Sequence, residues 1–248
     1  VKELVDKFKI TLIGVNGFGV FDAYTKLDTL FLPRYRLRRP NSGGISFVSQ
    51  SGALGSAMLD LATTENYGIA KFISYGNAID INESDLLEYL GEDENTKVIC
   101  LYVEGIKDGK KFFEVAKKVS KKKPIVVIKG GLTEEGSKAA LSHTGSLAGK
   151  KEVYFGVFKQ AGMIRANSLE EMFHIASLIE REVEFKGNKI QVITNGGGYG
   201  IVSTDAIVSS RNLKMAELSK ETGKKLRKIF SAKINIKNPL DLLGDATT

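Results

Sequence analysis

Short apolar runs alternate along the chain with longer segments in which apolar residues recur every three or four positions. Runs of this length are typical of buried strands, and the longer segments have the period of a helix. The pattern predicts strands at 10–13, 45–49, 69–74, 98–103, 125–129, 163–166 and 189–194. It predicts helices near 53–64, 83–90, 109–120, 152–161, 168–181, 200–210 and 219–230. Apolar strands alternating with helices indicate an α/β fold with a doubly wound parallel sheet, covered by helices on both faces.

The same pattern divides the chain. A polar stretch at 182–188 ends in Lys-Gly-Asn before a new strand, which is typical of a boundary between domains. We therefore predict one whole α/β domain at 40–185 and a partial second one at 186–248. Residues 1–39 offer one strand and a long irregular segment, so we expect them to be the end of another domain. The chain begins with Val1, and we expect it to be a fragment, or a shortened relative, of something longer.

Composition narrows the class of protein. The 248 residues are 42% apolar and 26% charged, which excludes disordered, collagen-like and coiled-coil proteins. A net charge of +7 suits nucleic acid, phosphorylated metabolites or a lysine-rich solvated surface. No known nucleic-acid motif surrounds the densest basic runs, 34–39 and 117–123, so we expect no nucleic-acid partner. No apolar stretch has the length of a bilayer span, so we expect no membrane association.

The one cysteine, Cys100, lies inside the apolar run 98–103, and we expect it to be buried. A single cysteine cannot form an intrachain disulfide. This favours a reducing compartment, and we predict a cytoplasmic protein.

Two predicted strand-to-helix turns share one chemistry. The first contains Ser49, Gln50, Ser51, Gly52 and Ala53, and the second contains Asn195, Gly196, Gly197 and Gly198. Small residues at a helix start let backbone N–H groups approach an anion, and the helix dipole adds positive potential. Ordinary tight turns also use glycine and serine, so the turns alone leave both interpretations open. Neither contains the Gly-Lys-Ser/Thr sequence that closes a P-loop.

Two histidines occur in quite different settings. His174 lies opposite the apolar stripe of its predicted helix, and we expect it to be exposed. His143 lies between 130 and 150, a stretch rich in glycine, serine and alanine, and long loops of this kind are usually functional. Since no second histidine or cysteine is available there to build a typical transition-metal site, we expect no metal. A neutral imidazole can instead attack phosphorus, if a carboxylate holds its other N–H.

Glu104 is a candidate for that carboxylate. It follows the predicted strand 98–103, and the carboxyl ends of strands are where doubly wound sheets form their sites. A glutamate that is simply exposed at the end of a strand would give the same pattern.

Seven segments, taken in order, resemble ADP-forming acetyl-CoA (acyl-CoA) synthetases of the succinyl-CoA synthetase superfamily. They are Ser-Gln-Ser-Gly-Ala-Leu-Gly, Tyr-Gly-Asn, Tyr-Val-Glu-Gly-Ile, Val-Ile-Lys-Gly-Gly, Ser-His-Thr-Gly-Ser-Leu-Ala-Gly, Thr-Asn-Gly-Gly-Gly and Asn-Pro-Leu-Asp-Leu. The similarity covers nearly the whole chain. It implies that 40–185 is a flavodoxin-like domain bearing a phosphohistidine, and that 1–39 is the tail of a CoA-binding Rossmann-like domain.

The resemblance also implies an acid–CoA ligase reaction and roles for particular residues. In these enzymes acyl-CoA, phosphate and ADP give the acid, CoA and ATP through an acyl phosphate and a phosphohistidine. By resemblance His143 is phosphorylated, Glu104 steadies it, and Gly76 and Asn77 lie near acyl-CoA. The resemblance also implies that the turns 49–53 and 195–198 bind phosphate. ADP or ATP with Mg would bind an ATP-grasp partner domain or subunit, and we expect a homo- or hetero-oligomer.

The sequence departs from the family pattern at 14–17, where Gly-Val-Asn-Gly stands in place of a Gly-Pro-Asn-Cys turn. By the same resemblance, we expect this chain to lack most of the CoA-binding part and the whole ATP-grasp part. A non-catalytic regulatory or scaffold relative is therefore an alternative, although many such relatives are expected to lack the loop histidine that this chain keeps.

Overall fold

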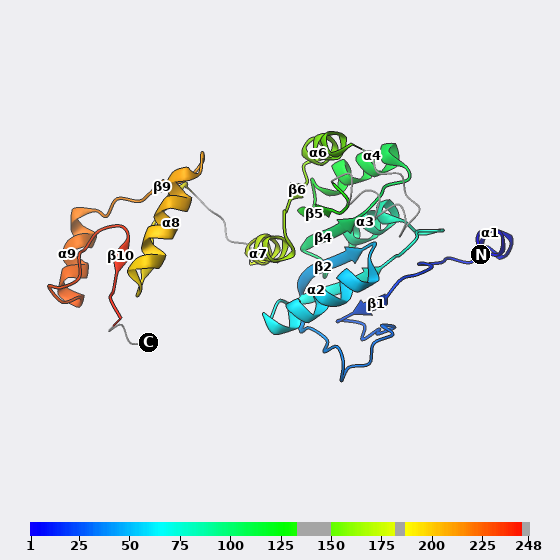
Figure 1. Cartoon of the computed structure of the whole chain (residues 1–248), viewed down its shortest axis with the longest axis horizontal. Helices are drawn as coiled ribbons and strands as arrows, with labels where there is room; N and C mark the ends of the chain where they lie inside the picture. Colours follow the sequence, from blue (N-terminus) through cyan, green and yellow to red (C-terminus); the bar gives the residue numbers. More distant parts are fainter. Residues whose placement is uncertain (133–149, 182–186, 245–248) are drawn as a thin grey trace. The chain divides into compact units, whose positions relative to one another are not determined.

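The computed structural model describes residues 1–132, 150–181 and 187–244. Contacts divide the chain into two compact units, Val1–Val183 and Glu184–Thr248, each of which is described by itself. Figure 1 shows their elements. The first unit has helices α1 (Lys2–Phe8), α2 (Gly52–Thr64), α3 (Glu83–Glu92), α4 (Gly109–Val119), α6 (Lys151–Gln160) and α7 (Leu169–Glu180). Its strands are β1 (Gly19–Asp22), β2 (Ser42–Ser49), β3 (Ile69–Ser74), β4 (Val98–Val103), β5 (Ile125–Lys129) and β6 (Ile164–Arg165).

The six strands form one sheet in the order β1-β3-β2-β4-β5-β6. All neighbouring pairs are parallel except β1 and β3, which run antiparallel. Without β1, the order is that of a flavodoxin-like sheet, in which the first strand of the chain lies between the second and the third. The predicted doubly wound α/β fold is therefore confirmed. Because the chain reverses its direction of winding at β2, the switch point lies between the carboxyl ends of β2 and β4.

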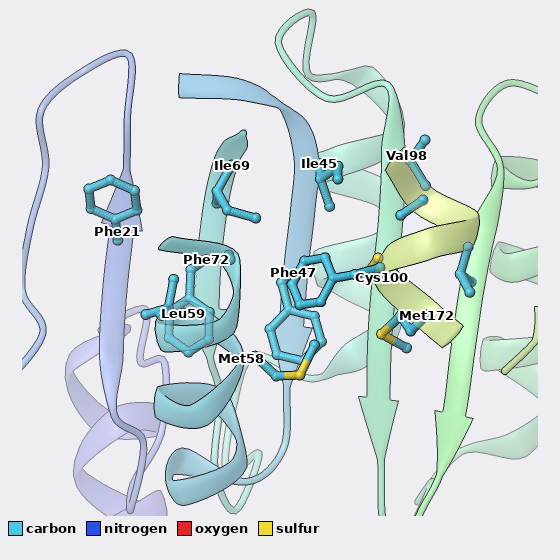
Figure 2. Packing of buried hydrophobic residues seen from close by; sticks show 14 of the residues in the cluster. Phe21, Ile45, Phe47, Met58, Leu59, Ile69, Phe72, Val98, Cys100 and Met172 are labelled. Atoms are coloured by element: carbon cyan, nitrogen blue, oxygen red, sulfur yellow. The ribbon is translucent and has the colours of Figure 1, made fainter. Parts of the chain in front are cut away.

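Alternation along the strands divides the core into two layers. Phe47 and Cys100 face the side covered by α2 and α7, where Met58 and Met172 pack against them (Figure 2). Val48 and its neighbours face the opposite side, under α3, α4 and α6. Because successive side chains point to opposite faces, strands that are apolar throughout need helices on both sides. Cys100 is buried as a free thiol, as predicted.

The predicted strand at 10–13 is wrong, since this segment forms no strand. Its backbone instead pairs with the loop after β3. The N–H groups of Ile81 and Ile79 donate to the carbonyls of Leu12 and Gly14, at 3.2 and 3.0 Å. Leu12 N–H donates in turn to Asp80 Oδ2 at 2.9 Å. The apolar pattern identified an extended segment, but not that a loop would be its partner.

Short elements escaped the sequence analysis. The edge strand β1 and helix α1 have too few residues to show a period. In the second unit the predicted strand 189–194 is divided into β7 (Lys189–Ile190) and β8 (Ile193–Thr194). β7 pairs with β9 (Lys214–Met215), and β8 pairs with β10 (Leu240–Asp241), both in parallel. The helices of this unit are α8 (Gly197–Ser209) and α9 (Lys220–Ile229).

Residues 1–39 belong to the first unit, and β1 extends its sheet. A buried ion pair helps to hold this edge. Lys71 on β3 is 5% exposed, and its Nζ lies 2.8 Å from Asp22 Oδ2 on β1 and 3.2 Å from Asp93 Oδ1. Burial raises the pKa of Asp22, but hydrogen bonds from Lys71 and from the N–H groups of Thr25 and Tyr24 outweigh it and lower that pKa to about 2.

We predict that Lys71→Met lowers the free energy of unfolding by about 3–5 kcal/mol at pH 7, because it leaves the buried carboxylate of Asp22 and the partly buried carboxylate of Asp93 without their cation. Urea unfolding followed by circular dichroism measures this. Lys122→Met, which removes a pair between exposed side chains with Glu92, is the control and should cost less than about 1 kcal/mol. Equal losses in the two variants would contradict the prediction.

We also predict an acid-sensitive step. The lowered pKa of Asp22 contributes stability above the unfolded-state pKa of about 3.9, and that stability is lost as the pH falls from about 4 to about 2. Asp22→Asn should flatten this part of the curve of stability against pH. A curve with the same slope as that of the wild type would contradict the prediction.

Candidate functional site

The turn between β2 and α2 is built by hydroxyl groups. Ser49 Oγ accepts from Ser51 N–H at 3.2 Å and donates to Ser51 O at 2.7 Å, which closes the turn as the strand ends. Ser51 is the N-cap of α2, and its Oγ accepts from Leu54 N–H at 3.3 Å. The N–H groups of Gly52 and Ala53 lie in the first turn of the helix, where no helical carbonyl can accept from them. The N–H groups of Gly52 and Ala53 at this helix start can therefore donate to an anion.

A cleft of about 420 Å³ opens at this helix start. Gln50, Ser51, Gly52 and Ala53 line it, and so does Asn77 from the loop after β3. Phe18 and Phe31 form an apolar side of the cleft, with their ring centroids 4.8 Å apart. A volume of this size, with apolar walls and a few polar groups, is typical of a small-molecule site.

The predicted site residues Ser49 and Gly76 are absent from this cleft lining and shape the chain around it. Ser49 closes the turn, as described above. Gly76 has a φ of +53°, and a Cβ there would lie 2.2 Å from Val15 O. The loop therefore passes against residues 14–17 with no room for a side chain.

Glu104 directly follows β4, on the other side of the switch point. Its N–H and that of Gly105 donate to Gln50 Oε1, at 2.7 and 3.0 Å. Its carbonyl accepts from Lys129 Nζ at 2.8 Å, and its carboxylate Oε1 accepts from Tyr102 Oη at 3.3 Å. Side chains from β4, from the end of β5 and from the β2–α2 turn thus surround one glutamate.

Burial and charge tune the groups beside Glu104. Burial raises the pKa of Tyr102, and the nearby charge of Glu104 raises it further, so the phenol keeps its proton at neutral pH. Burial lowers the pKa of Lys129, while the charge of Glu104 opposes that change. Lys129 Nζ also lies 4.6 Å above the ring centre of Tyr154. Tyr102, Lys129 and Gln50 thus form a hydrogen-bonded polar cluster around Glu104.

A second cleft, of about 470 Å³, includes Gln50, Glu83, Gly105 and Lys107 among its lining residues. Lys107 Nζ donates to the carbonyls of Asn77 and Ala78, at 2.9 and 3.0 Å. Glu83 is 3% exposed, and burial raises its pKa. Gln50 thus lies between the two clefts.

The turn before α8 repeats the local geometry of the turn before α2. Thr194 Oγ1 accepts from Gly196 N–H and donates to Gly196 O, both at 3.1 Å. Gly196 is the N-cap of α8, while Asn195, Gly197 and Gly198 are exposed around the helix start. The predicted similarity of the two turns therefore extends to their hydrogen bonds, and both leave first-turn amides accessible.

His143 lies outside the described residues, so its predicted approach to Glu104 stays a prediction. His174 is exposed, as predicted. Across the described part of the chain, no three Asp, Glu, His or Cys side chains gather closely enough to hold a metal ion. That part also contains no apolar helix of bilayer-spanning length.

Sequence reasoning missed the lysine and the aromatic residues of the site. Lys129 ends the strand 125–129, and a charge at the end of an apolar strand is the signal that marks it. Phe18 and Phe31 left no such signal, because they lie in irregular segments that only the fold brings to the cleft.

The family described as "Succinyl-CoA ligase like flavodoxin domain" matches residues 42–179, more than half of the chain. The chain belongs to this family. An ADP-forming acetate–CoA ligase of Methanocaldococcus jannaschii is 46% identical over 247 residues, which are 100% of this chain and 34% of that protein. The alpha subunit of ADP-forming acetate–CoA ligase II of Pyrococcus furiosus is 42% identical, over 99% of this chain and 53% of that subunit.

The fold of the chain is also similar to that of a solved acetyl-coenzyme A synthetase structure. The dinucleotide-forming acetyl-coenzyme A synthetase 1 of Ca. Korarchaeum cryptofilum, in complex with phosphate and ADP, superposes with a TM-score of 0.86 at 36% identity. The match covers 98% of this chain and 52% of that one. This member of the succinyl-CoA ligase-like family therefore spans between a third and about half of the length of these relatives.

We predict that Gly76→Ala lowers the free energy of unfolding by about 1–3 kcal/mol, because a Cβ would require a strained φ and would overlap the Val15 carbonyl. Gly109→Ala is a matched control, since nothing lies within 4 Å of its Cβ position. It should leave stability unchanged or raise it by up to about 1 kcal/mol. Thermal unfolding of both variants decides, and equal effects would contradict the prediction.

Proposed function

We propose that the chain performs the acyl-CoA and phosphate half of an ADP-forming acyl-CoA synthetase reaction. Phosphate attacks the acyl carbon of the thioester, the C–S bond breaks, and an acyl phosphate and CoA result. The phosphoryl group then passes to His143 and from there to ADP. The observation that carries the proposal is the position of the cleft, in which the α2 helix start, Gln50 and Asn77 meet beside Glu104 at the switch point.

The α2 helix start supplies the electrostatics for phosphate. The N–H groups of Gly52 and Ala53 can donate to phosphate oxygens, and the helix dipole favours negative charge at the same point. Donors fixed in place before the reaction stabilise charge that develops in the transition state without reorganising. By the same reasoning, the turn 195–198 before α8 is a second phosphate-binding helix start.

Asn77 and the aromatic pair suggest the position of the thioester. We place the acyl group in the apolar part of the cleft beside Phe18 and Phe31, with Gly76 and Asn77 close to acyl-CoA. Relatives of this chain are named acetate–CoA ligases, which makes acetyl-CoA the first substrate to test.

Phosphoryl transfer to His143 needs one ring nitrogen free to attack. That nitrogen forms the P–N bond as the P–O bond to the acyl group breaks, and the acid leaves as its carboxylate. The other ring nitrogen keeps its proton and becomes part of a positively charged ring. Glu104 would accept from that N–H and stabilise the charge, which is the usual role of a carboxylate behind a nucleophilic imidazole.

The second half of the reaction requires another part of the protein. Because this chain spans between a third and about half of its relatives, we propose a partner domain or subunit of the ATP-grasp type, which binds ADP or ATP with Mg. We further propose a homo- or hetero-oligomeric, cytoplasmic enzyme.

We predict that acetyl phosphate transfers its phosphoryl group to His143. Intact mass should show one added phosphate that is stable in base and labile in acid, as expected of a phosphorylated imidazole. His143→Asn should show none. MgATP with an ATP-grasp partner chain should give the same label. No label from either donor, on a chain shown to be folded by circular dichroism, would favour a non-catalytic relative.

We predict that Glu104→Gln slows labelling of His143 by about 100-fold or more, because the amide keeps the shape but loses the charge that stabilises the imidazolium. Glu88→Gln, which changes a largely exposed carboxylate on α3, is the control and should label at the wild-type rate. The rate of label appearance by mass spectrometry measures both. A wild-type rate in Glu104→Gln would remove Glu104 from the mechanism.

A further inference from the structure

Gln50 joins the two strands that border the switch point. Its backbone N–H donates to Tyr102 O at 3.1 Å, continuing the β2–β4 ladder one residue past its end. Its side chain extends the connection further, since Oε1 accepts from Glu104 N–H and Gly105 N–H, at 2.7 and 3.0 Å. One residue thus ties the phosphate turn to the peptide that carries the carboxylate.

We propose that Gln50 is a positioning residue, whose side-chain oxygen fixes the Glu104 peptide rather than binding phosphate itself. The proposal rests on the proposed function, in which Glu104 stabilises the phosphorylated imidazole. It also assigns to Gln50 a different role from the direct phosphate contact that the turn motif implies.

The chemistry of the amide sets the orientation of the Gln50 side chain. Both groups that approach it from Glu104 and Gly105 are N–H donors, so only the oxygen can face them. Gln50 is 5% exposed, which leaves water little access to replace that oxygen. The side-chain oxygen is therefore held by the protein and is not free to turn toward a ligand.

The carbonyl of Glu104 is held as well. Lys129 Nζ donates to it at 2.8 Å and also to the carbonyl of Gly130. The backbone at Glu104 has left the sheet and has no strand neighbour to hold it. Side chains from the β2–α2 turn and from the end of β5 do so instead, on the N–H and on the C=O. Glu104 is thereby fixed although it lies in a loop.

Two substitutions separate positioning from phosphate binding. Gln50→Leu removes the oxygen and keeps a buried side chain of similar size. Gln50→Glu keeps an oxygen that accepts from both amides but removes the NH₂ group and adds a negative charge. A positioning role requires only the oxygen, whereas a phosphate ligand requires the NH₂ donor.

The first measurement is amide hydrogen exchange at Glu104 and Gly105 in the full chain, followed by NMR. We expect Gln50→Leu to speed exchange at these two amides by at least tenfold, with the β2–β4 ladder unchanged. Gln50→Glu should keep both amides slow. If Gln50→Leu does not fold by circular dichroism, Gln50→Met takes its place, since it keeps the unbranched chain without the oxygen. Wild-type exchange in the leucine or methionine variant would overturn the proposal.

The second measurement is the rate of His143 labelling at increasing acetyl phosphate. We expect Gln50→Leu to lower the maximal rate by at least tenfold and to change the half-saturating concentration by less than twofold. Gln50→Glu should recover most of the maximal rate but need more acetyl phosphate, because its charge repels the anion. A raised half-saturating concentration with an unchanged maximal rate in Gln50→Leu would make Gln50 a phosphate ligand and overturn the proposal.

The two measurements also distinguish the proposal from the proposed function. If wild-type chain takes no label, the proposed function fails, while the exchange data still decide whether Gln50 holds the Glu104 peptide. If the wild type labels normally and Gln50→Leu matches it in rate and exchange, only the role of Gln50 fails.

Discussion

The parallel pairing of β2 with both β3 and β4 is the constraint on which the first unit depends. β2 is buried along residues 45–49 and hydrogen-bonds to a strand on each side, so every other strand takes its place relative to it. β2 is the first of the parallel strands and lies inside the sheet, with β3, the next strand of the chain, on one side of it and β4 on the other. The switch point and its two clefts follow from that order.

The candidate site is built from residues that directly follow the carboxyl ends of β2 and β4. Where β2 ends, a serine closes the turn and α2 begins with accessible amides. Where β4 ends, Glu104 leaves the sheet, and Gln50 and Lys129 replace the strand neighbours it has lost. A loop residue held on both its N–H and its C=O keeps its backbone position without help from a ligand. This prior order suits a step in which charge develops on an imidazole.

The two helix starts illustrate how one local solution serves two units. Ser49 with Ser51, and Thr194 with Gly196, make the same pair of hydrogen bonds between a hydroxyl and the peptide two residues on. Sequence reasoning recognised their shared small residues but not the hydroxyl that organises each turn. A side-chain hydroxyl competes well for nearby backbone groups, which makes such turns frequent where a strand gives way to a helix.

The sequence by itself determined the alternation of strands and helices, the doubly wound sheet and the turn at 49–53. These features follow from periodicity and turn chemistry, which act between residues near one another in the chain. Only the tertiary structure decided that residues 12–15 pair with a loop, that β1 forms one edge of the sheet, and that Phe31, Asn77 and Gln50 share a cleft. Each of these features depends on contacts between residues far apart in sequence. Such contacts produce no periodic pattern of residue types that could be recognised in the sequence. The hydrogen bonds around Glu104 also depend on the tertiary structure. Their partners Gln50, Tyr102 and Lys129 come from three separate segments that meet only when the sheet has formed.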